Sequence, residues 1–381
     1  MNEIMNQYDG WLRDESEVAA LTMRQRLVPI EGEDAIFFPP TYPIDQNKAG
    51  YNIDRFDDGS SVCQIDSVGS QANRMEPIFK QKEYNHLVPQ VVISAGDCSV
   101  DLLEAGHRAA DAIIRFSTLG LEIHEAFLAY KKGNAVPLSR IAPTSIVFGA
   151  WDSRATQVKL PRIVRSVIRA YNVRELTRSA QYATIAGEIM ADGEAQAVAP
   201  GGKETKESQL GLAHVPAVKT HGGVQLHGEK AEIRREAILN LSALRTVAGG
   251  FLEETFKIRR YLLGLALVSF TAPMETNLRE GCELVPDPES PATWKMVKHD
   301  GTRKDFAIRH EDALAFATVS AEAFGVTGQK HDGVFEPELA RKMINLSDPD
   351  RKKIFRQGVT KEAIEQLRKK GSEAKGSSKK S

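Results

Sequence analysis

Short β-branched segments alternate irregularly with amphipathic segments along this chain, and the alternation limits the folds that it can adopt. Strands are expected at residues 51–56, 61–65, 91–94 and 145–148. Asp58 and Gly59 form a typical hairpin turn between the first two strands. A doubly wound parallel sheet would need regular strand and helix repeats, which this pattern lacks, so we expect an α+β fold.

Apolar residues at three- and four-residue spacing predict several helices. One is expected over residues 101–116 with Ser99 or Asp97 as its N-cap, and another from Glu229 to the Gly249-Gly250 break. The apolar face of that second helix would consist of Ile233, Ala237, Leu241, Leu244 and Ala248. Further helices are expected at residues 311–324, from Pro337 and after Thr360.

The charges of the whole chain nearly cancel, because 50 Lys and Arg residues accompany 51 Asp and Glu residues. A neutral protein has no global attraction to nucleic acid, so such a function has to depend on where the charges lie. Hydrophobic residues at 41% and charged residues at 27% are typical of a globular protein.

No segment is expected to direct the chain to a membrane or out of the cell. The N-terminus is acidic and polar, whereas a secretory signal is basic and then apolar. The apolar run at residues 261–272 is shorter than the roughly 20 residues of a membrane helix, and it predicts a buried strand or helix end. Cys63, Cys98 and Cys282 are too widely spaced for a metal or disulfide motif, so we expect free thiols in the cytoplasm.

A length of 381 residues allows two domains, or one elaborated domain, at roughly 150 residues per domain. Two stretches are expected to lie outside the core of the fold. Residues 192–228 are rich in glycine, and residues 371–381 form a polar, basic tail that we expect to be flexible.

The common catalytic signatures are absent, including the phosphate-binding loop, the zinc-protease helix and the serine-hydrolase elbow. The closest group of histidines is His214, His221 and His227, whose irregular spacing favours polar loop positions over a metal site. We therefore expect no enzymatic activity, no cofactor and no metal.

A strongly basic segment is nevertheless present at residues 154–178. Its cations are Arg154, Lys159, Arg162, Arg165, Arg169, Arg174 and Arg178. Only Glu175 opposes them, so seven cations and one acid leave a net charge of +6. Arginine donates paired hydrogen bonds to phosphate and stacks on bases, which favours nucleic-acid binding. The alternative is a solvated face whose arginines pair with carboxylates elsewhere in the chain.

The spacing leaves two arrangements open for this segment. As a strand it would place Arg165, Arg169 and Tyr171 on one face, and as a helix it would align Arg162 with the same two arginines.

The string SVGSQANR forms a second polar group. On a helix Ser67, Ser70, Gln71 and Arg74 share one face, whose donors suit a sugar-phosphate backbone, and Asn73 belongs to the same string. An ordinary polar helix face, with Ser67 as its N-cap, is the alternative.

Several strings in register resemble one known family. They are DSVGSQANRME, FGAWDS, LPRIVRSVIRAYNV, RSAQY, HGGV and RRYLLGLAL, and they span residues 51–285. The sequence is similar to the backbone subunit of type I-G (formerly I-U) CRISPR effector complexes, of the RAMP superfamily (Cascade backbone).

This resemblance implies an RNA-recognition-motif core of ferredoxin-like topology with large insertions. It places an N-terminal extension at residues 1–50, the two parts of the core at 51–191 and 229–370, and a thumb-like protrusion at 192–228. It implies a non-catalytic subunit that binds CRISPR RNA, the guide, and presents it for pairing with a target DNA strand. The implied partners are further copies of itself in a filament-like oligomer, the other effector subunits and a helicase-nuclease, with no membrane.

By the same resemblance, the RNA-binding residues are expected in the two polar groups and in the HGGV string. They are Ser67, Ser70, Gln71, Asn73, Arg74, Arg154, Lys159, Arg162, Arg165, Arg169, Arg178, His221 and Gly222.

A ribonuclease of the same superfamily, which processes guide RNA or cuts target RNA, is the alternative function. Some related subunits cut RNA with a loop aspartate, and Asp66 and Asp152 are the aspartates beside the matching strings. Neither has an acid or base partner nearby in the sequence, which favours a non-catalytic role.

Overall fold

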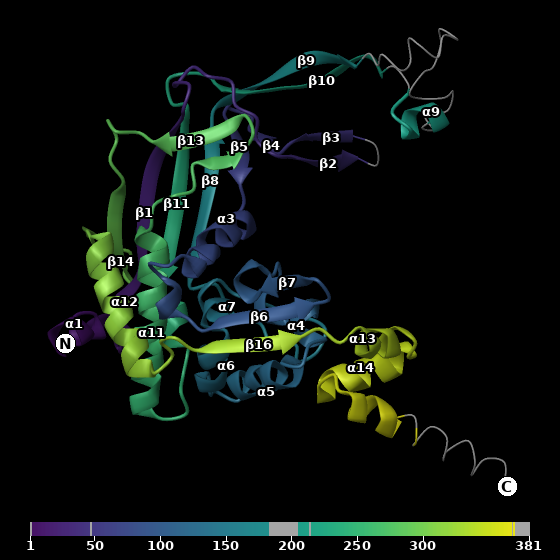
Figure 1. Cartoon of the computed structure of the whole chain (residues 1–381). Helices are drawn as coiled ribbons and strands as arrows, with labels where there is room; N and C mark the ends of the chain where they lie inside the picture. The colour runs from purple at the N-terminus through teal and green to yellow at the C-terminus, as the bar shows by residue number, and fades with distance from the viewer. Residues whose placement is uncertain (1, 46–47, 183–204, 213–214, 368, 370–381) are drawn as a thin grey trace.

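The computed structural model describes residues 2–45, 48–182, 205–212, 215–367 and 369, and it confirms the expected α+β fold (Figure 1). The strands are β1 (Val18–Pro29), β2 (Thr41–Asp45), β3 (Lys48–Tyr51), β4 (Ile53–Arg55), β5 (Ser61–Asp66), β6 (Gln90–Ala95), β7 (Cys98–Asp101), β8 (Val164–Tyr171), β9 (Val173–Tyr182), β10 (Val215–Leu226), β11 (Glu232–Asn240), β12 (Asn277–Arg279), β13 (Cys282–Pro286), β14 (Thr293–Lys298), β15 (Arg303–Asp305) and β16 (Lys330–Val334).

The helices are α1 (Asn2–Asn6), α2 (Asp9–Leu12), α3 (Val68–Met75), α4 (Ala112–Arg115), α5 (Gly120–Lys131), α6 (Val136–Ile141), α7 (Pro143–Val147), α9 (Lys206–Gln209), α10 (Leu241–Arg245), α11 (Leu252–Thr271), α12 (His310–Phe324), α13 (Pro337–Ile344) and α14 (Asp348–Gln357). Shorter 3-10 turns are η1 (Glu76–Lys80), η2 (Asn85–Leu87), η3 (Leu102–Glu104) and η4 (Arg108–Ala110).

Strand β11 lies at the centre of the main antiparallel sheet, paired with β1 on one side and with β8 on the other. In the described residues the sheet runs in the order β12-β13-β1-β11-β8-β5-β4, and β14 also pairs with β1. The series β14-β1-β11-β8 is the 4-1-3-2 order of a ferredoxin-like βαββαβ unit. Strands β5 and β4 extend that unit at the β8 edge.

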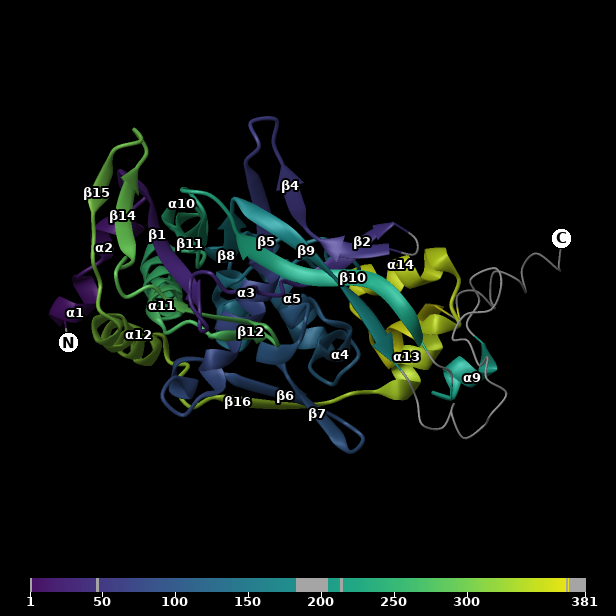
Figure 2. The same ribbon diagram turned by 90° about the horizontal axis from the view of Figure 1, so that it is seen from above.

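Helices α3 and α11 cover one face of this sheet (Figure 2). Every second residue of β11, beginning at Ile233, is buried on this face, while the residues between remain half-exposed. Ala237 and Leu239 belong to the core under the helices, whereas Ile233 belongs to a second apolar cluster with Leu27 and Leu284. Helix α12 packs on α11 where Gly264 meets Ala317, and a Cβ atom at Gly264 would lie 2.7 Å from the Ala317 Cα. A single large hydrophobic core continues from these helices into α5, α6 and α7.

A second, smaller sheet forms beside this helical region, in the order β16-β6-β7 (Figure 1). Strand β16 follows α12 in the chain and pairs in parallel with β6. The chain then enters α13, α14 and a last helix at residues 361–367, which share a separate apolar cluster around Leu339 and Ile354.

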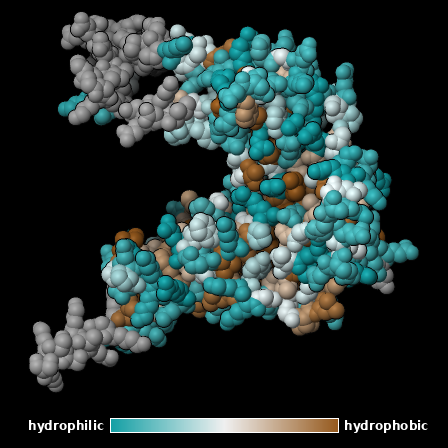
Figure 3. All heavy atoms as spheres, turned by 180° about the vertical axis from the view of Figure 1, so that it is seen from behind, coloured by the Kyte–Doolittle hydropathy of each residue, from teal (hydrophilic) through white to brown (hydrophobic). Residues whose placement is uncertain are grey.

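Strands β9 and β10 form a two-stranded ribbon that projects from the main sheet (Figures 1 and 2). The space-filling view shows a hollow between this arm and the arm that carries α13 and α14 (Figure 3). Of the predicted protrusion at 192–228, residues 205–212 and 215–228 are described, and their partner strand β9 precedes that range. The predicted tail at 371–381 lies outside the described residues.

Several local predictions are confirmed. Strands β4 and β5 pair as a hairpin, with φ of +82° at Gly59 in its turn. Helix α12 ends at Gly325 in the left-handed conformation, and Thr360 caps the last helix through a hydrogen bond of 3.1 Å from the Ala363 N–H. Of the two arrangements left open for the basic segment, residues 164–171 adopt the strand.

Other local predictions are wrong. Most of the helix expected from Glu229 is strand β11, because its residues are buried at alternate positions inside a sheet that pairs on both sides. Only Leu241–Arg245 at its end are helical, as α10. The strand expected at 145–148 is helix α7. By contrast, the apolar run at 261–272 agrees with its expectation of a buried strand or helix end, because it forms the buried C-terminal half of α11. Residues 101–116 form separate short turns, because Asp101 and Asp111 each cap a new turn.

None of the helices in the described part of the chain is both long and apolar enough to cross a lipid bilayer.

Replacing Gly264 with Ala should lower the free energy of unfolding by about 1–2 kcal/mol, because overpacking the α11–α12 crossing outweighs the gain in helix propensity. Urea unfolding measures the loss. Gly10→Ala is the matched control, because nothing lies within 4 Å of the added atom and the variant should be at least as stable as the parent protein. Equal stability of both variants would contradict the close packing of α11 on α12.

Candidate nucleic-acid interface

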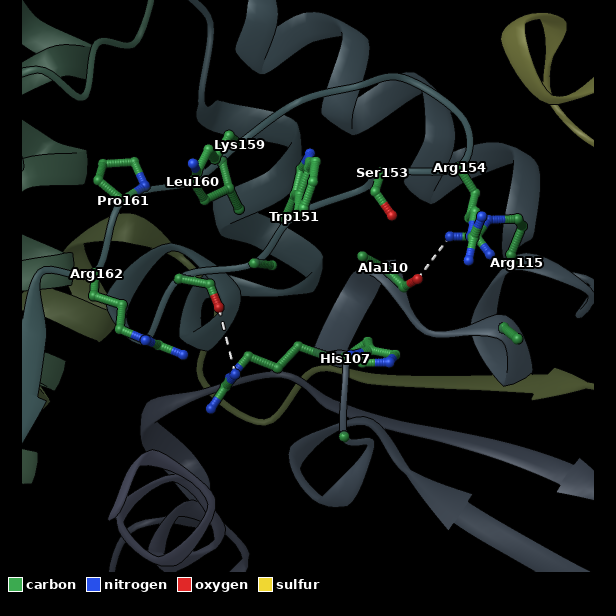
Figure 4. A pocket seen from close by; sticks show the side chains of 15 residues that line it. His107, Ala110, Arg115, Trp151, Ser153, Arg154, Lys159, Leu160, Pro161 and Arg162 are labelled. Atoms are coloured by element: carbon green, nitrogen blue, oxygen red, sulfur yellow. Dashed lines mark hydrogen bonds between the residues drawn. The ribbon is translucent and has the colours of Figure 1, made fainter. Parts of the chain in front are cut away.

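A basic pocket of about 600 Å³ lies between residues 106–115 and the loop at 149–162 (Figure 4). Its cationic lining residues are Arg108, Arg115, Arg154, Lys159 and Arg162, together with His107. No carboxylate occurs among the described residues that line it. Three cations of the predicted basic segment therefore meet two further arginines that come from a different part of the chain.

The loop at 149–162 is held by Asp152, which is buried and accepts four hydrogen bonds from Arg115, Ala155 and Thr156. Burial alone would raise the pKa of Asp152, but these hydrogen bonds and the Arg115 charge lower it below its ordinary value. The carboxylate is thus ionised, and its hydrogen bonds hold the loop in place.

The fixed loop pairs Trp151 with Lys159 through an isolated β-bridge. The ammonium of Lys159 lies 5.7 Å from the centre of the Trp151 ring, and the Trp151 side chain is 59% exposed. An exposed aromatic ring beside a cation offers a base a stacking surface and its phosphate a counter-ion.

Arg108 and Arg115 form ion pairs with carboxylates that are not part of the pocket lining. Arg108 Nε donates to buried Glu76 at 2.5 Å, and Arg115 Nη2 donates to Asp152 at 3.0 Å. Because the desolvation of Glu76 outweighs its attraction to Arg108, the pKa of Glu76 is raised to about 7.

The other three cations of the pocket have no carboxylate partner among the described residues. Arg154 and Lys159 are exposed, and Arg162 donates from Nε to the Phe148 carbonyl at 3.0 Å. Burial, and then the charge of Arg108, lower the pKa of Arg162. Gly149, with φ of +79°, leaves room for this side chain, since a Cβ there would lie 2.7 Å from Arg162 Cγ. The pocket therefore presents three cations available for an anion.

Arg165 and Arg169 lie elsewhere, on the sheet face that α3 and α11 leave open. Arg165 is exposed and has no ion pair among the described residues, whereas Arg169 pairs with Glu236 at 3.6 Å. Glu236 also interacts with Arg24, Arg234 and Tyr171. The alternative interpretation, in which the arginines pair with carboxylates of the same chain, thus holds for Arg169.

Two cations of the basic segment lie on the β9–β10 ribbon. Arg174 donates to the Gln225 side chain at 3.0 Å, and the Arg178 guanidinium lies 5.7 Å from the centre of the Phe38 ring. The seven cations are therefore divided among the pocket, the open sheet face and the ribbon, and do not form one stripe.

His221 and Gly222 lie at a register shift in the same ribbon. The His221 ring packs edge-on against Tyr51 at 5.2 Å. A Cβ at Gly222 would lie 2.6 Å from the Thr177 backbone, so this glycine allows the two strands to approach. His214 lies outside the described residues, and no cluster of potential metal ligands occurs within them.

Helix α3 carries the SVGSQANR string, and it contributes less exposed surface than the spacing suggested. Ser67 caps the helix through a hydrogen bond of 3.2 Å from the Ser70 N–H. Gln71, which was expected to contact RNA, is 2% exposed and its amide is hydrogen-bonded to Asp66 and Ser166, so its side chain offers no surface for such a contact. Asn73 is exposed, and its Oδ1 accepts from Arg108 at 3.4 Å, next to the pocket.

Arg74 is partly exposed but already engaged, since it donates to Asp66 at 3.2 Å and to the Leu278 carbonyl at 2.5 Å. Asp66 is buried, with Gln71 and Arg74 both donating to its Oδ2 atom. Both aspartates of the nuclease alternative are therefore buried and hydrogen-bonded within the chain.

Sequence reasoning missed His107, Arg108, Arg115 and Trp151. Trp151 stands inside the FGAWDS string, so its position beside the basic segment was an available signal. The other three precede the segment by about 40 residues, and only the tertiary fold brings them to it.

Residues 21–175 match the model of a family described as CRISPR-associated protein GSU0053. This match supports a CRISPR-associated role. It covers less than half of the chain, but it includes the basic pocket, α3 and β8. No curated protein matches the chain.

Glu76 should make stability depend on pH. Its native pKa of about 7 lies above the ordinary 4.5, so its contribution to stability is fully present below pH 4.5 and is lost as the pH rises through 7. The contribution lost is on the order of 3 kcal/mol. Urea unfolding from pH 4.5 to 8 should show a shallower pH dependence for Glu76→Gln than for the parent protein. Glu338→Gln, at an exposed glutamate, should leave the dependence unchanged, and equal slopes in all three proteins would contradict the assignment.

Proposed function

We propose that this chain is a non-catalytic, guide-RNA-binding backbone subunit of a type I-G CRISPR effector complex. The basic pocket carries the proposal, because it joins three cations that lack a carboxylate partner to an exposed tryptophan. A single-stranded backbone needs cations at intervals and aromatic surfaces for unstacked bases. The family match supports the CRISPR association and includes these residues.

The proposed subunit binds the guide through its phosphates and leaves sequence recognition to base pairing with the target DNA strand. Asn73 beside the pocket, Arg165 on the open sheet face and Arg178 on the ribbon are additional candidate contacts. Further copies of the chain, other effector subunits and a helicase-nuclease are its proposed partners, and the cytoplasm is its proposed location.

The ribonuclease alternative would require a reactive group near the bound strand. Asp152 and Asp66 already accept hydrogen bonds from the protein, and both are nearly inaccessible to solvent. A general base must reach the proton that it removes, so these positions favour the non-catalytic role.

Neutralising the pocket should weaken RNA binding and reduce its salt dependence. The variant Arg154→Gln, Lys159→Gln, Arg162→Gln should flatten the slope of log affinity against log salt by about 2 units, from about 0.7 per phosphate contact. Fluorescence anisotropy with a labelled single-stranded RNA at several salt concentrations measures the slope.

The matched control removes three exposed cations from outside the pocket, as Arg303→Gln, Lys304→Gln, Lys330→Gln. It has the same net charge as the pocket variant and should retain the parental slope. A third variant, Arg165→Gln, Arg169→Gln, tests the open sheet face. If that variant flattens the slope and the pocket variant does not, the RNA path is assigned to the wrong surface.

Trp151 should contribute by stacking on a base. Trp151→Ala should weaken RNA binding by about 1–3 kcal/mol, whereas Trp151→Phe should retain part of the affinity. RNA should also quench the tryptophan fluorescence of the parent protein but not of Trp151→Phe, because Trp11 and Trp294 are partly buried in the core. Quenching that persists in Trp151→Phe would contradict the stacking role.

A further inference from the structure

A second cavity, of about 330 Å³, lies beneath α3, where that helix meets the chain that leaves α11. Arg235 of β11 forms part of its wall, and Arg74 of α3 forms another part. Arg235 is 3% exposed and occupies a helix-facing position of β11, between the apolar residues Ile233 and Ala237. A fully buried cation is thus directed into a cavity.

Arg235 lacks the partners that a buried guanidinium normally has. Its Nε donates to Ser166 Oγ at 3.0 Å, and its Nη2 has only the weak contact with Met75 Sδ at 3.9 Å. Within the described residues Nη1 has no hydrogen-bond partner, and no carboxylate forms an ion pair with this side chain. Burial lowers the pKa of Arg235 to about 10, and no acidic neighbour opposes that shift.

Another buried arginine, Arg259, has a hydrogen-bond partner for each of its three guanidinium nitrogens. Arg259, 5% exposed, donates to the carbonyl oxygens of Leu12, Arg245 and Val247, and it forms an ion pair with Asp14. Arg235 has neither a carbonyl nor an acid. Burying an ionised group without a counter-charge destabilises the folded state, so the position of Arg235 costs stability unless an anion enters the cavity.

The cavity wall favours a phosphate group as that anion. Arg235 and Arg74 come from different elements, and the oxygens of one tetrahedral phosphate can accept hydrogen bonds from two guanidinium groups at once. Glu275 is the carboxylate of the lining, and its Oε1 accepts from the Asn277 N–H at 3.3 Å. It forms no ion pair with Arg235 or Arg74 in the described structure.

We propose that this cavity binds a phosphate group, held mainly by the buried guanidinium of Arg235. Arg74 lines the same cavity, but its Nε already pairs with Asp66, so it contributes only through its remaining N–H groups. Inorganic phosphate and the phosphate of an RNA backbone share the chemistry that the cavity recognises. The RNA source rests on the proposed function, whereas the phosphate site itself does not. Arg235 would then be a binding residue that stabilises the folded chain only when the anion is present.

Thermal unfolding in increasing inorganic phosphate, at constant ionic strength, tests the site. The melting temperature of the parent chain should rise with phosphate concentration, because a ligand that binds only the native state stabilises it. Arg235→Met keeps a side chain of similar length without the charge. It should lose the phosphate-dependent rise while melting no lower than the parent chain in phosphate-free buffer. Arg303→Met, an exposed control, should keep the full rise.

A second variant keeps the test decisive if Arg235→Met fails to fold. Thr276→Glu places a carboxylate at the exposed edge of the cavity without disturbing the core, and it should also abolish the phosphate response. An unchanged phosphate response in both variants would overturn the site. Stabilisation by an acidic peptide but not by phosphate would also overturn it, because the cavity would then bind a protein carboxylate.

RNA titrations of the same variants identify the source of the phosphate. If Arg235→Met loses the phosphate response and also binds single-stranded RNA less tightly, the bound phosphate belongs to the RNA backbone. Unchanged RNA affinity with a lost phosphate response supports a site for free phosphate. The pocket variant at residues 154, 159 and 162 tests the proposed RNA function separately, so the two proposals can fail independently.

Discussion

A chain of buried hydrogen bonds joins α3 to the main sheet, and both candidate sites depend on it. Ser166 Oγ donates to Gln71 at 2.7 Å, and Gln71 donates to Asp66 at 2.6 Å, linking β8, α3 and β5. Arg235 extends the chain to β11 through Ser166. Ser166, Gln71 and Asp66 are all buried, so losing Gln71 would leave both of its partners with an unsatisfied group in a poorly hydrated interior. This network fixes α3 against the sheet, with Asn73 facing the basic pocket and Arg74 at the mouth of the second cavity.

The arginines of this protein differ in function according to their counter-ions. Arg108 and Arg259 form ion pairs inside the protein and hold elements together. Arg154 and Lys159 project from a loop that is itself fixed by the buried carboxylate of Asp152. The net charge of the chain conceals this division, because a few carboxylates neutralise the arginines that build the fold and leave the cations of the pocket available.

The elements that could be predicted from the sequence are those whose signals are local. Gly325 ends α12 and Ser67 caps α3, because a left-handed glycine and a capping hydroxyl act within one turn of helix. Strand β11 could not be predicted, since Ile233 and Ala237 fit a helical spacing that continues into Leu241 and Leu244 of the true helix α10. Strands β1 and β8 supply its hydrogen bonds, and they lie far away in the sequence.

For the candidate site, the sequence by itself determined that cations concentrate between residues 154 and 178 and that Trp151 lies next to them. Only the tertiary structure decided which cations remain available. It paired Arg169 with Glu236, joined Arg162 to a pocket with Arg108 and Arg115, and buried Arg235 without an acid. The physical reason is that a cation attracts a polyanion only where no protein carboxylate has already neutralised it, and that depends on distances in space and not along the chain.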